Sequence, residues 1–312
     1  MRAIRVDEFG GPSVLRPVEL PTPVPGPGEV LVGVEVAGVL FLDTLIRRGG
    51  APAFGITPPY VPGRGAAGGV LAVGPDVEPS WVGRRVLVDG PGTYAAEVAA
   101  PVPSLVPVPD GLDLADAMAL LHDGGTALAL VGAVGVRPGE TVLVLPAAGG
   151  AGSVLVQLAR RSGARVVGAA RGRKLGLVRS LGADLAVDYG EPGWADAVRR
   201  RVGQVDVVFD GVGGTLGAEA FGLVAEGGRY SGYGTAGGAP VTRSTPDVEV
   251  RGVAQLADFA DGRRARQERV LAEAAAGRLH PVVGREFPLE KAADAHAALE
   301  NREIAGKALL LP

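Results

Sequence analysis

The sequence contains no cysteine, and its three histidines, His122, His280 and His296, are widely spaced along 312 residues. The lack of cysteine excludes disulfide bonds and every metal site that depends on thiolates, and the scattered histidines argue against a zinc site. An excess of charge of one sign is also missing, since the formal net charge is −3. There is therefore no electrostatic reason to expect binding to nucleic acid or to an anionic membrane.

A leader and a membrane span are not indicated either. Residues 1–10 lack the apolar core of a secretion signal. Residues 141–159 are long, uncharged and apolar enough to score as a span, but Pro146 and three glycines would break a helix in lipid, and no second candidate accompanies this one. We therefore expect a soluble, cytoplasmic protein. At about 150 residues per domain, the chain has room for two domains.

Two styles of sequence follow one another. Up to residue 115, short β-branched runs such as Glu29–Val36 and Arg84–Asp89 alternate with proline and glycine turns, which predicts a largely antiparallel β domain. From residue 116, strand and helix patterns alternate, which indicates βαβ units and a parallel sheet that binds ligands at the carboxyl ends of its strands. The expected strands are 142–145, 165–170, 186–188, 205–209 and 229–232, and the expected helices are 152–163, 173–182, 192–202 and 215–225.

The most informative segment is TVLVLPAAGGAGSVLVQLA at residues 141–159, in which an apolar strand, a glycine-dense turn and an apolar helix follow one another. Gly149, Gly150 and Gly152 carry no side chain that would keep a pyrophosphate from the backbone, and the start of the helix would bind the anion. Ala147 replaces the usual first glycine of G-x-G-x-x-G. An ordinary tight turn between a strand and a helix would give the same pattern, so both interpretations stay open at this point.

Charge near the end of the second expected strand indicates which dinucleotide would bind. NAD sites carry an acid there, about 20 residues beyond the glycines, for the ribose 2′-hydroxyl. Here the strand ends at Ala170, and Arg171, Arg173 and Lys174 follow, with no acid before Asp184. These cations would attract a 2′-phosphate, which arginine can bind through two parallel hydrogen bonds. An NADPH site is therefore favoured over the alternative that these residues are only solvated cations at the start of a helix. The helix dipole disfavours positive charge at that end.

Several further motifs follow one another along the chain, in the same order as in a known protein family: GVLFLD at 38–43, VPGRGAAG at 61–68, AAGGAGS at 147–153, LGADLAVDY at 181–189, DGVGG at 210–214, and the closing Ala295-His and Gly306-Lys. Over nearly its whole length the chain resembles the zinc-independent quinone oxidoreductase branch of the medium-chain dehydrogenase/reductase superfamily. The resemblance implies an α/β fold: a Rossmann doubly wound parallel sheet at 116–259, and a GroES-like, mainly antiparallel β domain built from both termini, 1–115 and 260–312. It also implies a homodimer and a cleft for nicotinamide and substrate.

The resemblance extends the expected NADP(H) site beyond the glycines. Ser153 and Gly211 lie within its glycine motifs, Tyr189 matches a tyrosine that helps to hold the adenosine phosphate, Thr126 a contact of the nicotinamide end, and Lys307 a lysine near the cofactor. Each of the last three has a plain alternative. Tyr189 would cap a strand end, Thr126 would bond its own helix backbone, and Lys307 would be a solvated surface lysine.

The substrate side departs from related families. Where zinc alcohol dehydrogenases place their catalytic cysteine this chain has Leu40, and where they place His-Glu it has Arg64-Gly65. The quinone oxidoreductase branch usually carries asparagine at the position of Leu40 and often tyrosine near Ala51. We therefore expect no metal, and a cleft that includes Leu40, Ala51 and Arg64. Hydride addition to a polarised, small hydrophobic acceptor, a quinone or an α,β-unsaturated carbonyl compound, fits this better than alcohol oxidation.

A titratable pair, His122 and Asp123, stands where the family commonly has Leu-Gln. At the cleft it would donate a proton or bind an oxyanion, because histidine titrates near neutral pH. A structural histidine on a helix face, beside an aspartate at a helix start, is the alternative. His296 lies within the amphipathic pattern Leu289–Glu300, which predicts a packed helix before the strand Ala308–Leu311.

Three hypotheses for the function remain. The first is an NADPH-dependent quinone or enone reductase. The second is a scaffold that binds NADPH without redox turnover, since Leu40 and Ala51 remove two polar groups of the branch. The third is a biosynthetic enzyme that uses the cleft for a non-redox cyclisation.

Overall fold

The computed structural model describes residues 1–312 as two compact units: Met1–His122 with Gln267–Pro312, and Asp123–Arg266. The first boundary lies after α2 (Leu114–Leu121), whereas the sequence placed it near residue 115. α2 packs against strands β3 (Glu29–Val39) and β4 (Gly65–Val73) of the first unit. The second boundary lies within α8 (Arg263–Ala275). No single helix is long and apolar enough to cross a membrane, although α2 and α3 (Asp123–Val134) taken together match the length and composition of a span.

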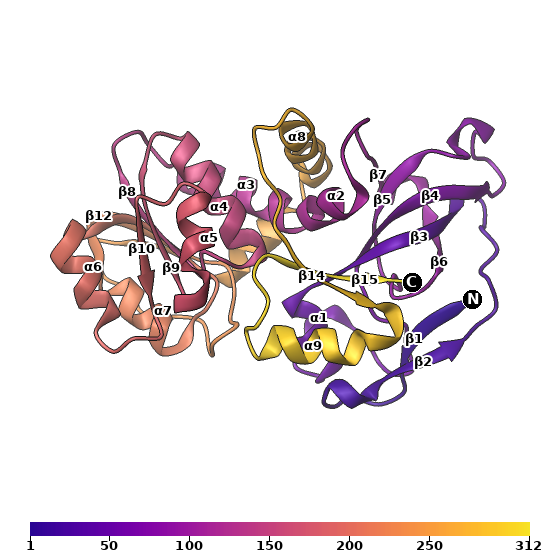
Figure 1. Ribbon diagram of the computed structural model, residues 1–312, viewed down its shortest axis with the longest axis horizontal. Helices are drawn as coiled ribbons and strands as arrows, with labels where there is room; N and C mark the ends of the chain where they lie inside the picture. Colours follow the sequence, from indigo (N-terminus) through magenta and orange to yellow (C-terminus); the bar gives the residue numbers. More distant parts are fainter. The chain divides into compact units, whose positions relative to one another are not determined.

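The second unit is built on a parallel sheet of six strands in the order β10-β9-β8-β11-β12-β13. Figure 1 labels four of them, β8, β9, β10 and β12. The chain enters at β8, adds β9 and β10 on one side, and then crosses to β11, β12 and β13 on the other. This reversal between β8 and β11 is the switch point at which Rossmann folds bind dinucleotides, and it confirms the expected architecture. The strands are β8 (Thr141–Leu145), β9 (Arg165–Ala170), β10 (Leu185–Asp188), β11 (Val205–Asp210), β12 (Val224–Gly232) and β13 (Glu249–Arg251).

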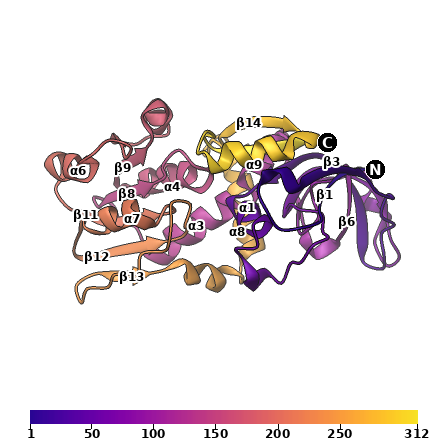
Figure 2. The same cartoon turned by 90° about the horizontal axis from the view of Figure 1, so that it is seen from below.

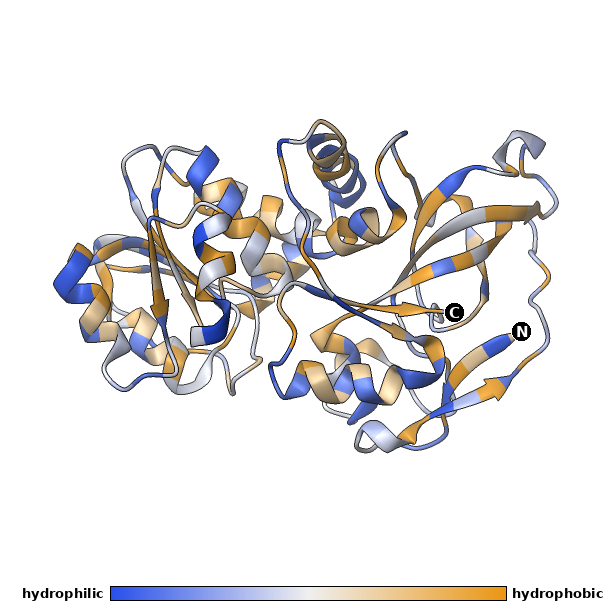
Figure 3. Ribbon diagram, in the orientation of Figure 1, coloured by the Kyte–Doolittle hydropathy of each residue, from blue (hydrophilic) through white to orange (hydrophobic).

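Helices connect these strands, and the sheet is buried because its strands are runs of small and β-branched apolar residues. In Figure 3 the strands of this sheet are largely orange, that is hydrophobic, whereas one end of the surface helix α6 is blue, that is hydrophilic. The helices are α3 (Asp123–Val134), α4 (Gly150–Arg161), α5 (Leu175–Ser180), α6 (Trp194–Val202) and α7 (Gly214–Phe221), and η5 (Gly172–Lys174) and η6 (Val253–Phe259) are short 3₁₀ turns.

Two local expectations for the second unit were wrong. The helix expected at 215–225 ends at Phe221, because Gly222 caps it and the strand β12 already begins at Val224. The sequence also gave no sign of β13, which has three residues and pairs in parallel with the far half of β12. Figure 2 shows β12 and β13 side by side at one edge of the sheet. A strand this short and polar has no hydrophobic period to detect.

The first unit is built from both terminal parts of the chain, in a two-stranded sheet of β1 and β2 and a larger sheet of seven strands. Strand β15, near the C-terminus, pairs antiparallel with β3, and the order is β14-β15-β3-β4-β5-β7, with β6 also on β3. At Gly68 an added methyl carbon would lie 1.8 Å from the carbonyl oxygen of Gly33, so only glycine lets β4 pass so close to β3. The strands are β1 (Arg2–Val6), β2 (Leu15–Glu19), β3 (Glu29–Val39), β4 (Gly65–Val73), β5 (Arg85–Asp89), β6 (Glu97–Pro101), β7 (Leu105–Pro107), β14 (Val283–Pro288) and β15 (Lys307–Leu311).

Helices α1 (Phe41–Arg47) and α9 (Ala292–Glu300) contact each other in this unit (Figure 1). The helix predicted at Leu289–Glu300 is present as the 3₁₀ turn η7 (Leu289–Lys291) followed directly by α9. The remaining short turns are η1 (Pro12–Val14), η2 (Pro52–Phe54), η3 (Pro79–Trp81) and η4 (Val102–Ser104).

A chain of buried polar side chains connects α1 to α9. Arg47 approaches His296 Nδ1 at 3.3 Å and Glu300 at 2.5 Å, and the hydroxyl of Tyr94 lies 3.0 Å from His296 Nε2 and 3.2 Å from Asp43. Because a guanidinium only donates, Nδ1 accepts from Arg47, Nε2–H donates to Tyr94, and Tyr94 donates to Asp43. Both ring nitrogens are thus bonded, and His296 is neutral and structural.

This network makes a prediction about stability against pH. Burial, and then the charge of Arg47, lower the pKa of His296 to about 3. Below about pH 6.5, the pKa of an unperturbed histidine, the unfolded chain binds a proton that the folded chain refuses. Stability is therefore full above that pH and falls as the pH drops towards 3, by about 3 kcal/mol at pH 4. Urea unfolding at several pH values should give a flatter curve for His296→Gln, whose amide bonds to both neighbours without titrating. Parallel curves for the two proteins would refute this.

Candidate functional site

The glycine turn between β8 and α4 is shaped for an anion. α4 begins at Gly150, with Gly149 as its N-cap residue. A methyl carbon on Gly152 would lie 1.9 Å from the carbonyl oxygen of Pro146, so only glycine lets the helix start this close to the turn. The first N–H groups of a helix have no acceptor within it, and the helix dipole adds positive potential. This end of α4 therefore offers backbone donors to a phosphate.

The departure at Ala147 has a local explanation. Its N–H donates to the carbonyl of Ala169 at 2.8 Å, and its methyl group faces Gly168, where an added methyl carbon would come within 3.1 Å of it. A glycine in β9 thus leaves room for the alanine in the turn. Ser153 is buried, and its hydroxyl donates to the carbonyl of Gly150 at 2.7 Å. The hydroxyl hydrogen of Ser153 is therefore already used inside α4.

The three predicted cations lie together where β9 ends. Arg171 precedes the turn η5, and the N–H of Lys174 donates to its carbonyl at 2.8 Å. Arg171 and Arg173 are exposed and Lys174 is half-buried. The structure adds an acid here, because a methyl carbon on Gly172 would lie 2.5 Å from Asp188 Oδ2. Asp188 ends β10, and β10 pairs with β9. This pairing brings the carboxylate of Asp188 close to the loop that follows β9, although the sequence of that loop contains no acid.

Further polar groups surround the carboxyl ends of β11 and β12. The N–H of Gly211 donates to the carbonyl of Leu145, and a methyl carbon on Gly211 would lie 2.7 Å from the ring of Tyr233. The buried hydroxyl of Tyr233 has no hydrogen-bond partner, and burial and then the charge of Asp210 raise its pKa. Asp210 accepts from two backbone N–H groups and from Tyr230, so it holds the turn together. Tyr233 was not predicted as a site residue.

The other predicted residues of this unit lie on two elements. Tyr189 follows β10, is buried, and donates its N–H to the carbonyl of Ala170 at 3.2 Å. Thr126 is half-buried on α3. Asp123 begins α3, and its Oδ2 would lie 2.2 Å from a methyl carbon on Gly150. The carboxylate of Asp123 therefore lies against the glycine turn.

The two residues of the predicted pair, His122 and Asp123, have different neighbours in the structure. His122 is the C-cap residue of α2 and belongs to the first unit, where its Nε2 lies 3.2 Å from Asp89 Oδ1. The side-chain amide of Gln267 donates to the other oxygen of Asp89 at 2.8 Å. Asp89 and Gln267 were not predicted. Asp89 ends an expected strand, which was the one signal available, but 33 residues separate it from His122.

The remaining predicted residues of the first unit lie on separate elements. Leu40 is the N-cap residue of α1 and Ala51 that of η2. Arg64 places its guanidinium 5.3 Å from the ring centre of Phe54, a cation–π contact. Lys307 is only 3% exposed, so it is not the solvated surface lysine of the alternative interpretation.

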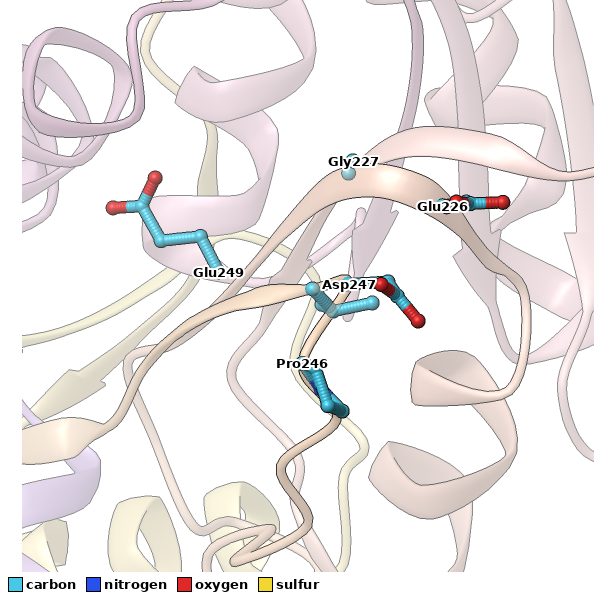
Figure 4. Close-up of a pocket in the computed structure, with 7 residues that line it drawn as sticks. Glu226, Gly227, Pro246, Asp247 and Glu249 are labelled. Carbon is cyan, nitrogen blue, oxygen red and sulfur yellow. The ribbon is translucent and has the colours of Figure 1, made fainter.

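A surface hollow elsewhere in the second unit does not belong to this constellation. It is lined by the first half of β12, the segment that precedes β13 and the first residue of β13, including Glu226, Asp247 and Glu249 (Figure 4). The carboxylate of Glu249 points away from those of the other two. The hollow lies at the amino-terminal half of β12, whereas Rossmann ligands bind beyond the carboxyl ends of the strands.

Comparison with known proteins places the chain in a family. The alcohol dehydrogenase GroES-like domain family matches residues 26–110, and the zinc-binding dehydrogenase family matches residues 181–310. A 2-haloacrylate reductase from a Burkholderia species is 36% identical over 98% of this chain and 98% of that protein. The quinone oxidoreductase of Sus scrofa is 33% identical over 100% of this chain and 98% of that protein. The chain belongs to the quinone oxidoreductase branch of the medium-chain dehydrogenase/reductase superfamily.

Structural similarity agrees with this membership. A mycobacterial protein solved in complex with NADPH has a TM-score of 0.89 and 35% identity, with 100% of both chains covered. The resemblance drawn from the sequence motifs is thus confirmed. The family name of the second match refers to zinc, but no three His, Cys, Asp or Glu side chains of this medium-chain dehydrogenase/reductase come close enough together to hold a metal ion.

Proposed function

We propose that this protein is a zinc-independent, NADPH-dependent oxidoreductase that reduces a quinone or an α,β-unsaturated carbonyl compound. The observation that carries the proposal is the pairing of the glycine turn at the end of β8 with three cations at the end of the adjacent β9. The relatives named as 2-haloacrylate reductase and quinone oxidoreductase, and the NADPH complex of a structural neighbour, support it.

The residues present fit NADPH. Glycine at positions 149, 150 and 152 leaves the start of α4 open to a pyrophosphate, and Arg171, Arg173 and Lys174 supply charge for a 2′-phosphate. The unpartnered hydroxyl of Tyr233 offers a further hydrogen bond. When bound, the cofactor supplies a hydride, and these side chains hold and orient it. Contacts from Ser153, Thr126, Tyr189, Gly211 and Lys307 remain proposals.

The substrate follows from the residues at the family's metal positions. Leu40 and the absence of cysteine leave no ligand set for a Lewis acid, so the acceptor must itself carry a polarised conjugated carbonyl group. Leu40 and Ala51 favour an apolar molecule, with Arg64 as a cation that lines the site. We also propose a homodimer in the cytoplasm, as the resemblance implied.

The test is turnover. Purified protein and NADPH are mixed with a panel of quinones, enones and 2-haloacrylates, and the near-ultraviolet absorbance of the reduced nicotinamide is followed. We expect loss of absorbance with at least one acceptor and much slower loss with NADH. No turnover on any acceptor, together with tight binding of NADPH, would favour the scaffold or the non-redox cyclisation instead.

Asp188 gives a second prediction for the cofactor. Its carboxylate lies against the cation loop and also accepts the N–H of Gly190 at 2.7 Å. Asp188→Asn keeps an oxygen for that bond and removes a negative charge near the expected phosphate. We expect NADPH to bind about three- to tenfold more tightly, since two charges near a protein surface interact by about a kcal/mol after screening. Calorimetry with NADPH and NADH measures the ratio, and an unchanged ratio would contradict this role.

A further inference from the structure

Three side chains of the first unit form a directed hydrogen-bond chain that ends on an imidazole. The amide of Gln267 donates to Asp89 Oδ2 at 2.8 Å, and Asp89 Oδ1 lies 3.2 Å from His122 Nε2. Because a carboxylate accepts, Nε2 must carry the hydrogen that it shares with Asp89. Asp89 thereby fixes the tautomer and orientation of the ring, and Gln267 fixes Asp89.

The other ring nitrogen of His122 has no partner. Nδ1 is buried and makes no hydrogen bond, although unsatisfied buried polar atoms are rare and cost about 1–3 kcal/mol each. His296, in the same unit, is the internal contrast because both of its nitrogens are bonded. Both ring nitrogens of His296 are used within the structure, whereas His122 is held on one side and its second nitrogen has no hydrogen-bond partner within the protein.

The surroundings of His122 leave room for the ring and place two carboxylates near it. A methyl carbon on Gly65 would lie 2.6 Å from His122 Cε1, so a side chain on β4 would displace the imidazole. Gly65 is itself held by the hydroxyl of Thr93 through both its N–H and its carbonyl. The carboxylates facing His122 are Asp89 on β5 and Asp43 at the start of α1, which also interacts with the cation of Lys307 on β15.

We infer that His122 is the proton donor of the reduction and that Asp89 and Gln267 are its positioning residues. This rests on the proposed function. A hydride adds to one end of the conjugated C=C–C=O system, its electron pair moves through that system to the carbonyl oxygen, and the nicotinamide is oxidised. The Nδ1–H bond of the His122 imidazolium breaks as the proton passes to the enolate. The neutral ring keeps its Nε2–H on Asp89 and takes a new proton from water. The substrate gains one hydride and one proton in total.

Two replacements of His122 test the proton donor. In His122→Asn we expect kcat to fall by about a hundredfold, the usual contribution of a general acid, while the Kd for NADPH, measured by fluorescence, stays within twofold. The pH–rate profile of the wild-type protein should bend where the imidazolium loses its proton, and this bend should be absent from the profile of His122→Asn. His122→Gln is the second variant if His122→Asn does not fold. His280→Asn is the matched control, because His280 is an exposed histidine of the same unit, and its rate should not change.

Asp89→Asn separates positioning from simple structural support. Loss of the carboxylate should move the bend in the pH–rate profile to lower pH, because an opposite charge no longer favours the imidazolium. A wild-type rate and pH profile in both His122 variants would overturn the inference, as would an unmoved bend in Asp89→Asn. If the wild-type protein does not oxidise NADPH with any of the acceptors tested, the proposed function itself fails, and the assignment of the proton donor fails with it.

Discussion

Replacement of Arg171, Arg173 and Lys174 together by glutamine is expected to raise the Kd for NADPH by a hundredfold or more and to leave the Kd for NADH nearly unchanged. The reason is that the two coenzymes differ only in the 2′-phosphate. Hydrogen bonds to charged groups contribute about 1.5–3 kcal/mol each, so the loss of two of them weakens binding by about 10²- to 10⁴-fold. Calorimetry at fixed ionic strength measures both constants, and the affinity of the wild-type protein for NADPH should fall as salt is added.

The chain offers a matched control for this experiment. Arg199, Arg200 and Arg201 form the last turn of α6, which leads into the amino end of β11, the edge of the sheet opposite the cofactor site. Their triple replacement by glutamine removes the same charge at a distance, and NADPH affinity should change little. Tight binding of NADH by the wild-type protein, or equal losses in the two triple variants, would contradict recognition of the phosphate by the β9 cations.

Gly152→Ala is expected to lower the free energy of unfolding by about 3 kcal/mol, the upper range for overpacking, and to abolish measurable NADPH binding. The added methyl carbon would lie 1.9 Å from the carbonyl oxygen of Pro146, and both are parts of rigid backbone. The start of α4 must therefore move away from β8, which misplaces the N–H groups offered to the pyrophosphate. Urea unfolding and fluorescence titration check the two effects.

Gly132→Ala is the control for that substitution. Gly132 lies in α3 of the same unit, and nothing stands within 4 Å of an added methyl carbon. Alanine there should stabilise the protein by about 0.5–1 kcal/mol, because it favours the helix and restricts the unfolded chain. A loss of stability in Gly132→Ala as large as that in Gly152→Ala would mean that the unit tolerates no substitution in its helices, and the argument from close approach would fail.

Some elements could be predicted from the sequence and others could not. The strand expected at 165–170 is β9 (Arg165–Ala170), because a short apolar run with charge at its start and after its end has clear limits. The strand β13 was missed, because its pairing with β12 supplies the order that its own three residues do not encode. The proposed cofactor residues lie in local motifs that the sequence displays, whereas Asp89 and Tyr233 had no motif to mark them.

The sequence by itself determined the family, the layered α/β architecture and the glycine turn followed by cations, since these depend on hydrophobic periods and spacings within a few residues of one another. Only the tertiary structure decided that His122 bonds to Asp89, while its neighbour Asp123 lies against Gly150. It also decided that Asp188 approaches Gly172. The physical reason is that such contacts join distant segments: strand order and packing bring their side chains together, and neither can be read from the local pattern of either segment.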